Sequence, residues 1–142
     1  MQQTGHFSIV HGYICGIGDP EESRVVIHAL PEQDAWPYLT RDLFAIPARE
    51  HSYWDHLVTF GTIYNGVERA WEEWLEKFEA LLQRLDWDEA HVYLQTDAWG
   101  SYDYHWKRTY TEVPQEDGDA IVISGWEFSG GPRTGLRDTY KS

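Results

Sequence analysis

Cysteine and long apolar runs are nearly absent from this sequence, and each absence excludes a class of protein. Cys15 is the only cysteine, so no internal disulfide can form, and this usage fits a reducing compartment. No stretch reaches the roughly 18 consecutive apolar residues of a membrane-spanning helix. The first residues, MQQTGHFSIVHGYICG, carry neither a basic leader nor an unbroken apolar run. We therefore expect a cytoplasmic protein with no membrane partner.

Basic residues are also scarce. The chain holds 11 Lys and Arg against 24 Asp and Glu, which gives a formal net charge of -13 at pH 7. A field of this sign repels nucleic acids and anionic membrane surfaces and attracts basic molecules. We therefore expect no nucleic-acid partner, and a basic macromolecule is the natural target.

The motifs of common metal, cofactor and nucleophile sites are missing as well. No two of the 7 histidines have the i, i+2 or i, i+4 spacing that places two ligands on one face of a strand or a helix. The chain has no G-x-S-x-G motif, and the glycines of GYICGIG lie in a strand pattern with no phosphate-binding helix after them. The sequence thus predicts no metal, no cofactor and no catalytic residues of these kinds.

The sequence does contain enough apolar material for one domain. Hydrophobic residues make up 42% of the 142 residues, and the 8 Trp, 9 Tyr and 5 Phe can bury large rings in a small core. We predict a single globular domain over residues 1–130. Residues 131–142 are rich in glycine and basic side chains, and we expect them to form a mobile tail.

The segment VERAWEEWLEKFEALLQRL predicts an amphipathic helix over residues 67–85. At about 100° per residue, its apolar side chains fall in one arc, which is typical of a helix packed on a sheet. Beside this arc, Glu68, Glu72 and Glu76 follow one another at i, i+4 spacing, a repulsive arrangement that a purely structural surface would more often avoid. The apolar arc consists of Val67, Ala70, Trp71, Trp74, Leu75, Phe78, Leu81, Leu82 and Leu85.

Segments on both sides of this helix have the alternation or the apolar runs of β-strands. The first two predicted strands, residues 6–17 and VVIHAL, are expected to pair as a hairpin through the turn GDPEES. The predicted strands are residues 6–17, VVIHAL, HLVTFGTIY, residues 91–95, residues 102–110 and AIVISGWEF.

Between the second and third of these strands, Asp34 is a candidate N-cap for a short helix through Phe44. Trp36, Leu39 and Leu43 would form its apolar side. Together these elements predict an α+β fold: a mainly antiparallel sheet of five or six strands with the long 67–85 helix packed on one face.

The segment DAWGSYDYHWKRTY, residues 97–110, combines aromatic rings with titratable side chains. In a strand, Tyr102, Tyr104 and Trp106 project to one side, and Asp103, His105 and Lys107 project to the other. The ring side fits either the core, favoured for Tyr104 and Trp106, or an exposed stacking platform. The titratable side fits either a solvated strand face or a small ligand or catalytic site.

Carboxylates and rings together predict a docking surface. Trp and Tyr supply interface hot spots, and acidic surroundings accelerate encounter with a basic partner. We predict one partner-binding patch on the helix and a second at the tip of the 97–103 turn. The patches comprise Glu68, Glu72 and Glu76, and Asp97, Trp99, Tyr102 and Asp103. Whether they are adjacent does not follow from the sequence.

The acidic Trp-rich helix ERAWEEWLEKFEALLQRL, the polar and aromatic strand YDYHWKRTY and the net charge resemble the small acidic immunity proteins of bacterial polymorphic and contact-dependent toxin systems. The resemblance is one of type; it spans most of the chain and includes no diagnostic motif. It implies a protein that binds and neutralises a cognate toxin and is not an enzyme. Because these families differ in fold and docking surface, no binding residue is carried over from them.

Two other functions are consistent with the residues. One is a small enzyme or ligand-binding domain that uses Asp103, His105 and Lys107, with rings that hold a planar or sugar-like substrate. The other is a phage-type inhibitor of host defence that mimics nucleic acid with its carboxylates. The sequence leaves monomer and homo-oligomer open.

Overall fold

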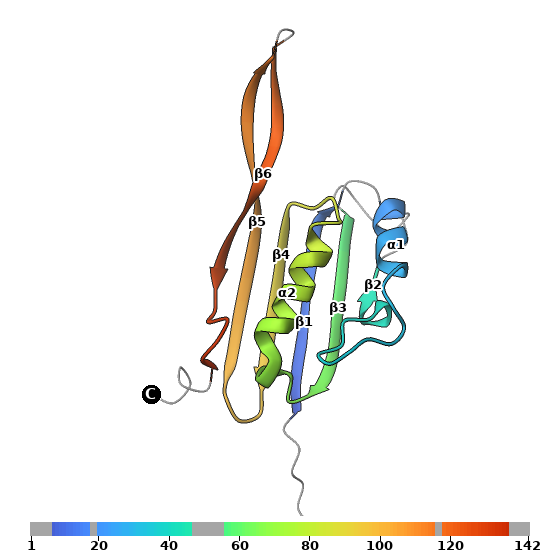
Figure 1. Cartoon of the computed structure of the whole chain (residues 1–142), viewed down its shortest axis with the longest axis vertical. Coiled ribbons are helices and arrows are strands. Elements are labelled where there is room, and N and C mark those ends of the chain that lie inside the picture. Colours follow the sequence, from blue (N-terminus) through green and yellow to red (C-terminus); the bar gives the residue numbers. More distant parts are fainter. Residues whose placement is uncertain (1–6, 18–19, 47–55, 116–117, 137–142) are drawn as a thin grey trace, which may run out of the picture.

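The computed structural model describes residues 7–17, 20–46, 56–115 and 118–136. They form one antiparallel sheet with strand order β2-β3-β1-β4-β5-β6 (Figure 1). The strands are β1 (Phe7–Ile17), β2 (Phe44–Ala45), β3 (His56–Asn65), β4 (Glu89–Thr96), β5 (Ser101–Gln115) and β6 (Gly118–Gly130). The helices are α1 (Pro20–His28) and α2 (Trp71–Leu82), with 3-10 turns η1 (Arg41–Leu43) and η3 (Val67–Ala70) before β2 and α2. The predicted α+β class and antiparallel sheet are confirmed.

Helix α2 packs on the middle of the sheet, and its apolar arc is buried as predicted (Figure 1). The Phe78 ring lies 5.3 Å from that of Phe60 on β3 and 5.1 Å from that of Trp106 on β5. Trp106 and its neighbour Tyr104 are fully buried, which confirms the core face predicted for them. The helix is shorter than predicted: it begins with η3 and ends at Leu82 rather than at residue 85. No helix among the described residues is long and apolar enough to cross a membrane.

The even-numbered residues of the central strands face α2, and the odd-numbered residues form the opposite face of the sheet. Val10, Ile14 and Val92 are buried on the α2 side. At Gly12 a Cβ atom would lie only 2.8 Å from Cζ of Phe60 and 1.9 Å from the backbone oxygen of His91. The close packing of the central strands therefore requires glycine at this position.

The segment VVIHAL, predicted as a strand, belongs instead to helix α1. Pro20 occupies the first helical position, where its missing N–H costs nothing, and Glu21 and Glu22 lie in the first turn, where the helix dipole favours acids. Ser23 and Ile27, at i, i+4 spacing, are buried, whereas Val25 is exposed. These start signals outweigh the β-branched run, so the predicted hairpin between residues 6–17 and VVIHAL is wrong.

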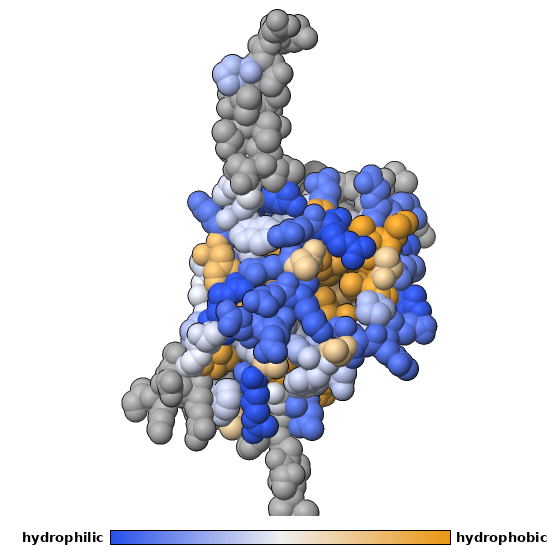
Figure 2. All heavy atoms as spheres, in the orientation of Figure 1, coloured by the Kyte–Doolittle hydropathy of each residue, from blue (hydrophilic) through white to orange (hydrophobic). Residues whose placement is uncertain are grey.

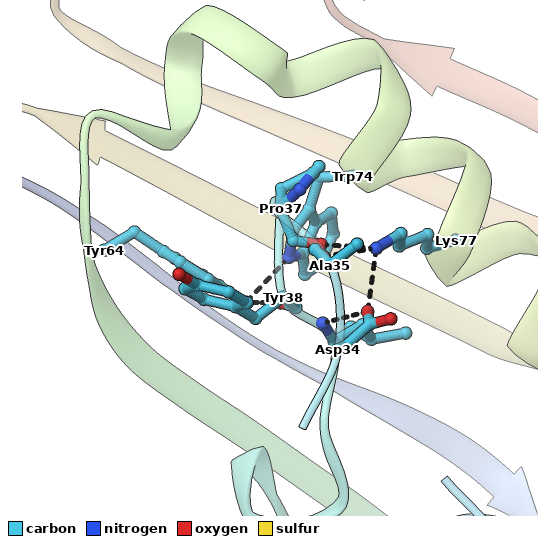
Figure 3. A network of polar contacts seen from close by, with 8 residues as sticks. Asp34, Ala35, Pro37, Tyr38, Tyr64, Trp74 and Lys77 are labelled. Atoms are coloured by element: carbon cyan, nitrogen blue, oxygen red, sulfur yellow. Dashed lines mark hydrogen bonds and ion pairs between the residues drawn. The ribbon is translucent and has the colours of Figure 1, made fainter. Parts of the chain in front are cut away.

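A loop over residues 34–40, the 3-10 turn η1 and the start of β2 replace the predicted helix from Asp34 to Phe44, and the loop is bound to α2 (Figure 3). Asp34 does not cap a helix: its Oδ2 accepts hydrogen bonds from the Leu39 N–H at 3.0 Å and from Lys77 Nζ at 2.7 Å. Lys77 also donates to two backbone carbonyl oxygens of the loop, at 2.8 Å each. Because proline disfavours helical backbone at the residue before it, Pro37 overrides the N-cap pattern.

Lys77→Met removes the hydrogen bonds that bind this loop to α2. We expect the free energy of unfolding at pH 7 to fall by about 1–2 kcal/mol, since hydrogen bonds to charged groups contribute roughly this much when partly exposed. Urea denaturation followed by circular dichroism measures the change. Arg84→Met, at an exposed basic residue just after α2, is the control and is expected to cost less than about 0.5 kcal/mol. Equal losses in the two variants would contradict this role of Lys77.

Residues 131–136, the first half of the predicted mobile tail, pack on the body of the protein. Leu136 is 3% exposed, and the Tyr104 hydroxyl donates to the carbonyl oxygen of Pro132 at 2.5 Å. Arg133 forms two hydrogen bonds with Glu79 of α2, at 2.8 and 2.9 Å. The remaining residues of the predicted tail, 137–142, lie outside the described residues.

Candidate functional site

A pocket of about 370 Å³ lies between the start of α2, the turn from β4 to β5 and the packed residues 133–136. Three of the predicted partner-binding residues line it: Glu68, Glu72 and Trp99. The helix patch and the turn predicted as separate patches are therefore neighbours in the fold. We call this the α2 pocket; the rest of its lining is Arg69, Trp71, Glu73, Arg133, Thr134, Gly135 and Leu136.

Among the described residues, two that line the α2 pocket have a buried polar atom without a hydrogen-bond partner: Trp71 at Nε1 and Glu68 at Oε1. The carboxylate of Glu68 is the more unusual of the two. Glu68 lies in η3, and only 4% of its surface is exposed. Its Oε1 is buried and has no hydrogen-bond partner within the described structure. An unpaired buried polar atom destabilises a fold by about 1–3 kcal/mol, and more when it is charged. A donor from another molecule would remove this cost once the Glu68 side chain turned its Oε1 toward the pocket.

The other acidic side chains of this ridge differ in their surroundings. Glu72 and Glu76 are exposed, and Figure 2 shows a hydrophilic surface over α2. Glu79 is bound by Arg133 and by the indole N–H of Trp106 at 2.8 Å. The hydrogen bonds to Glu79 raise the pKa of Arg133, and the charges of Glu79, Glu72 and Glu76 add to the rise. Within the described structure, neither Glu68 nor Glu72 has an ion-pair partner at salt-bridge distance.

The turn between β4 and β5 holds Trp99 against the pocket. The Trp99 N–H donates to Oγ1 of Thr96 at 2.8 Å, and this hydroxyl donates to the Gly100 carbonyl oxygen at 2.7 Å. The Tyr102 hydroxyl donates to the carbonyl oxygen of Leu136 at 2.7 Å and also contacts that of Trp99. Tyr102 thus holds two lining residues, Trp99 and Leu136, in place, but it does not line the pocket itself. Asp97 is exposed in the same turn.

Asp103, the last of the predicted partner-binding residues, lies on the opposite face of the sheet with His105 and Lys107. Its Oδ2 is 3.8 Å from Nε2 of His91, whereas His105 Nε2 is 3.3 Å from Oε1 of Glu89. Lys107 is exposed and pairs in register with Glu89. The three side chains therefore share this face of the sheet, as predicted, and Asp103 and His105 each lie close to a β4 side chain.

Aromatic rings of β1, β4 and β5 meet on this opposite face. The His91 ring stacks on Tyr93 at 4.4 Å and lies 5.2 Å from the His105 ring and 5.8 Å from the Tyr13 ring. Burial lowers the pKa of His91, and His105 lowers it further, while Asp103 opposes both. Strand register brings these histidines together from positions far apart in the chain, which is why histidine spacing gave no sign of the pair.

His91→Gln should make the stability of the fold less sensitive to acid. Because the folded-state pKa of His91 lies below its ordinary 6.5, the unfolded chain takes up this proton first, and stability falls as the pH drops through that window. Denaturant unfolding between pH 7.5 and 5.5 should therefore show a smaller loss for His91→Gln than for the wild type. His28→Gln, at an exposed residue of α1, should behave like the wild type. Identical pH profiles for all three proteins would contradict the assignment.

Among the residues that the structure describes, no group of three or more His, Cys, Asp or Glu side chains is placed to hold a metal ion. Comparison with models of known families, with curated proteins and with solved structures finds no match to this chain. The fold and the site define a class: a small acidic α+β domain whose pocket beside the central helix is lined by three glutamates and two arginines.

Proposed function

We propose that the protein is an immunity-type inhibitor that binds and neutralises a cognate bacterial toxin through the α2 pocket. The observation that carries the proposal is Oε1 of Glu68, which is buried without a donor at a pocket that Glu72 and Trp99 also line. A lysine or arginine of the toxin would supply the donor and the opposite charge. The ring of Trp99 would add apolar contact area of the kind found at interface hot spots.

The charge of the whole chain supports the same function. A net charge of -13 steers a basic partner toward the acidic surface and raises the association rate at low salt. Glu72 and Glu76 lie on the exposed side of α2, beside the pocket end of the helix. A toxin whose basic groove binds phosphate groups would present the complementary charge, and occupation of that groove would block its activity.

The test is co-expression with the product of the neighbouring gene in a bacterial host. We expect that product to stop growth when expressed alone, and growth to return when this chain is present. The purified proteins should form a stoichiometric complex in size-exclusion chromatography, and the association should weaken with salt. A neighbouring product that is harmless, together with saturable binding of a small molecule by this chain, would refute the proposal.

The same experiment separates the alternative functions. A nucleic-acid mimic would bind a host nuclease or another DNA-binding protein, and DNA would compete with it for that partner. A small enzyme would turn over a substrate and lose turnover in His105→Ala.

A further inference from the structure

A second pocket, of about 750 Å³, lies between the loop before β2 and strand β3. No partner-binding residue predicted from the sequence lines it. Its lining includes three rings and three carboxylates, and none of the described lining residues is basic. These residues are Glu32, Gln33, Asp34, Trp36, Tyr38, Thr40, Asp42, Leu43, Thr62, Ile63, Tyr64 and Asn65.

The three rings form one wall of this loop pocket. The Trp36 ring meets Tyr38 edge to face at 5.1 Å and Tyr64 edge to face at 5.9 Å. Trp36 and Tyr38 are 41% and 46% exposed, although large rings are usually buried in a protein core. Exposed rings that are held against one another present faces with negative electrostatic potential, and such faces attract cations.

Hydrogen bonds fix the loop that carries these rings, as Figure 3 shows. Lys77 of α2 donates to Asp34 and to the carbonyl oxygens of Ala35 and Pro37. On the other side of the loop, the Tyr64 hydroxyl donates to the Tyr38 carbonyl oxygen at 2.5 Å and accepts the indole N–H of Trp74 at 2.9 Å. The rings are therefore ordered before any ligand binds, which lowers the entropic cost of binding.

The carboxylates of the loop pocket are unequally neutralised. Asp34 pairs with Lys77, and Glu32 pairs with Arg41. Asp42 accepts a hydrogen bond from the Thr40 hydroxyl, and no ion pair of Asp42 occurs within the described structure. One negative charge therefore remains at the rim of a ring-walled pocket.

The pKa of Tyr64, which lines the same pocket, is raised mainly by burial and to a lesser extent by these carboxylates. Burial raises the pKa of Tyr64 to about 12, and the charges of Asp34 and Asp42 add to the rise, while the hydrogen bond from Trp74 opposes it. Only the part of the rise that comes from Asp34 and Asp42 reflects a negative field, and that part favours a positive charge in the neighbouring space.

We propose that the loop pocket binds an organic cation, an alkylammonium or guanidinium group, with the faces of Trp36 and Tyr38 against the cation and the Asp42 carboxylate as its counter-charge. Lysine or arginine side chains of a protein carry this chemistry, and so do small quaternary ammonium compounds. The proposal does not depend on the function of the α2 pocket, because the two pockets share no lining residue.

The test is a titration of the full chain, followed by NMR of its backbone and indole N–H groups. The probes are choline, the neutral isostere of choline in which a tert-butyl group replaces the trimethylammonium group, and short acetylated peptides that contain lysine, trimethyllysine or arginine. We expect saturable shifts at residues 34–43 and 62–65 with the cations. The neutral isostere should bind at least about 5-fold more weakly, since the cation–π attraction and the carboxylate both require a charge.

Two variants assign the binding to individual residues. Trp36→Leu and Asp42→Asn should each weaken choline or peptide binding by about 3- to 10-fold, whereas Glu127→Gln, at an exposed carboxylate of β6 that lines neither pocket, should leave it unchanged. Asp42→Asn keeps the test valid if Trp36→Leu disturbs the loop. Tighter binding of a peptide than of choline identifies a protein side chain as the ligand, and the reverse order identifies a small molecule. Equal binding of the neutral isostere, or unchanged binding by Asp42→Asn, would overturn the proposal.

Discussion

Glu72→Lys is expected to weaken binding of the toxin by about 100-fold, because it places a positive charge at the α2 pocket, where a basic side chain of the partner would bind. Glu72 is exposed and has no ion-pair partner within the described structure, so the substitution should leave the fold intact. The dissociation constant from isothermal titration, measured at two salt concentrations, gives the effect. Protection of growth in the co-expression assay should fall in parallel.

Glu127→Lys is the matched control for this variant. It changes the net charge of the chain by the same amount, but Glu127 is an exposed residue of β6 that does not line the α2 pocket. Long-range steering should therefore change equally in the two variants, and only Glu72→Lys should lose the local contact. If both variants weakened binding to the same extent, the effect would come from net charge, and the pocket would lose its assigned role.

Glu79→Ala should produce the largest loss of stability among the substitutions considered, about 2–3 kcal/mol in the free energy of unfolding. Glu79 accepts two hydrogen bonds from Arg133 and one from the indole of Trp106, and its side chain is 18% exposed. Alanine leaves the Arg133 charge and the buried Trp106 donor without their acceptor. Guanidinium denaturation followed by tryptophan fluorescence measures the loss.

The same substitution should also weaken partner binding, because Arg133 and residues 134–136 form one side of the α2 pocket. Glu79→Gln, which retains an acceptor for Trp106 and for one Arg133 nitrogen, should lose roughly half as much stability. Glu76→Ala, on the exposed side of the same helix, should change stability by less than about 0.5 kcal/mol. A loss for Glu79→Ala no larger than that for Glu76→Ala would show that the Arg133 contact does not hold the segment.

The elements with strong periodicity were the ones that the sequence predicted well. The apolar side chains of α2 repeat over several helical turns, and ring and titratable side chains alternate along several residues of β5. In both elements the tertiary packing buries the predicted apolar side. Tyr104 and Trp106 are buried, while Asp103, His105 and Lys107 lie on the opposite face. In these segments the local preference and the global fold require the same conformation.

The prediction of secondary structure failed in segments where two short sequence patterns favour different conformations. In α1, a β-branched run competes with the helix start at Pro20, Glu21 and Glu22, and the helix prevails because Ile27 is buried against the core. In the loop before β2, the N-cap pattern of Asp34 competes with Pro37, and Lys77 of α2 supplies the decisive contacts. Lys77 lies 43 positions from Asp34 in the chain, so the sequence around Asp34 could not predict this contact.

The sequence predicted several residues of the candidate site, but it did not predict how these residues are arranged in space. Glu68, Glu72 and Trp99 line one pocket, but the burial of Glu68 and the role of Arg133 depend on contacts between distant segments. Tyr102 supports the pocket, and Asp103 is on the other face because neighbouring strand residues alternate in direction. The loop pocket with Trp36, Tyr38 and Asp42 had no sequence motif, since its rings and carboxylates meet only through folding.

The most direct test of the central claim is carboxyl footprinting of the complex between this chain and its toxin. A carbodiimide couples an amine label to accessible carboxylates, and mass spectrometry compares labelling of the free and the bound chain at each residue. We predict that Glu72 and Glu73, which line the α2 pocket, lose most of their labelling in the complex, while Asp103 and Glu127 keep theirs. Full labelling of Glu72 and Glu73 in a stoichiometric complex would contradict docking at the α2 pocket.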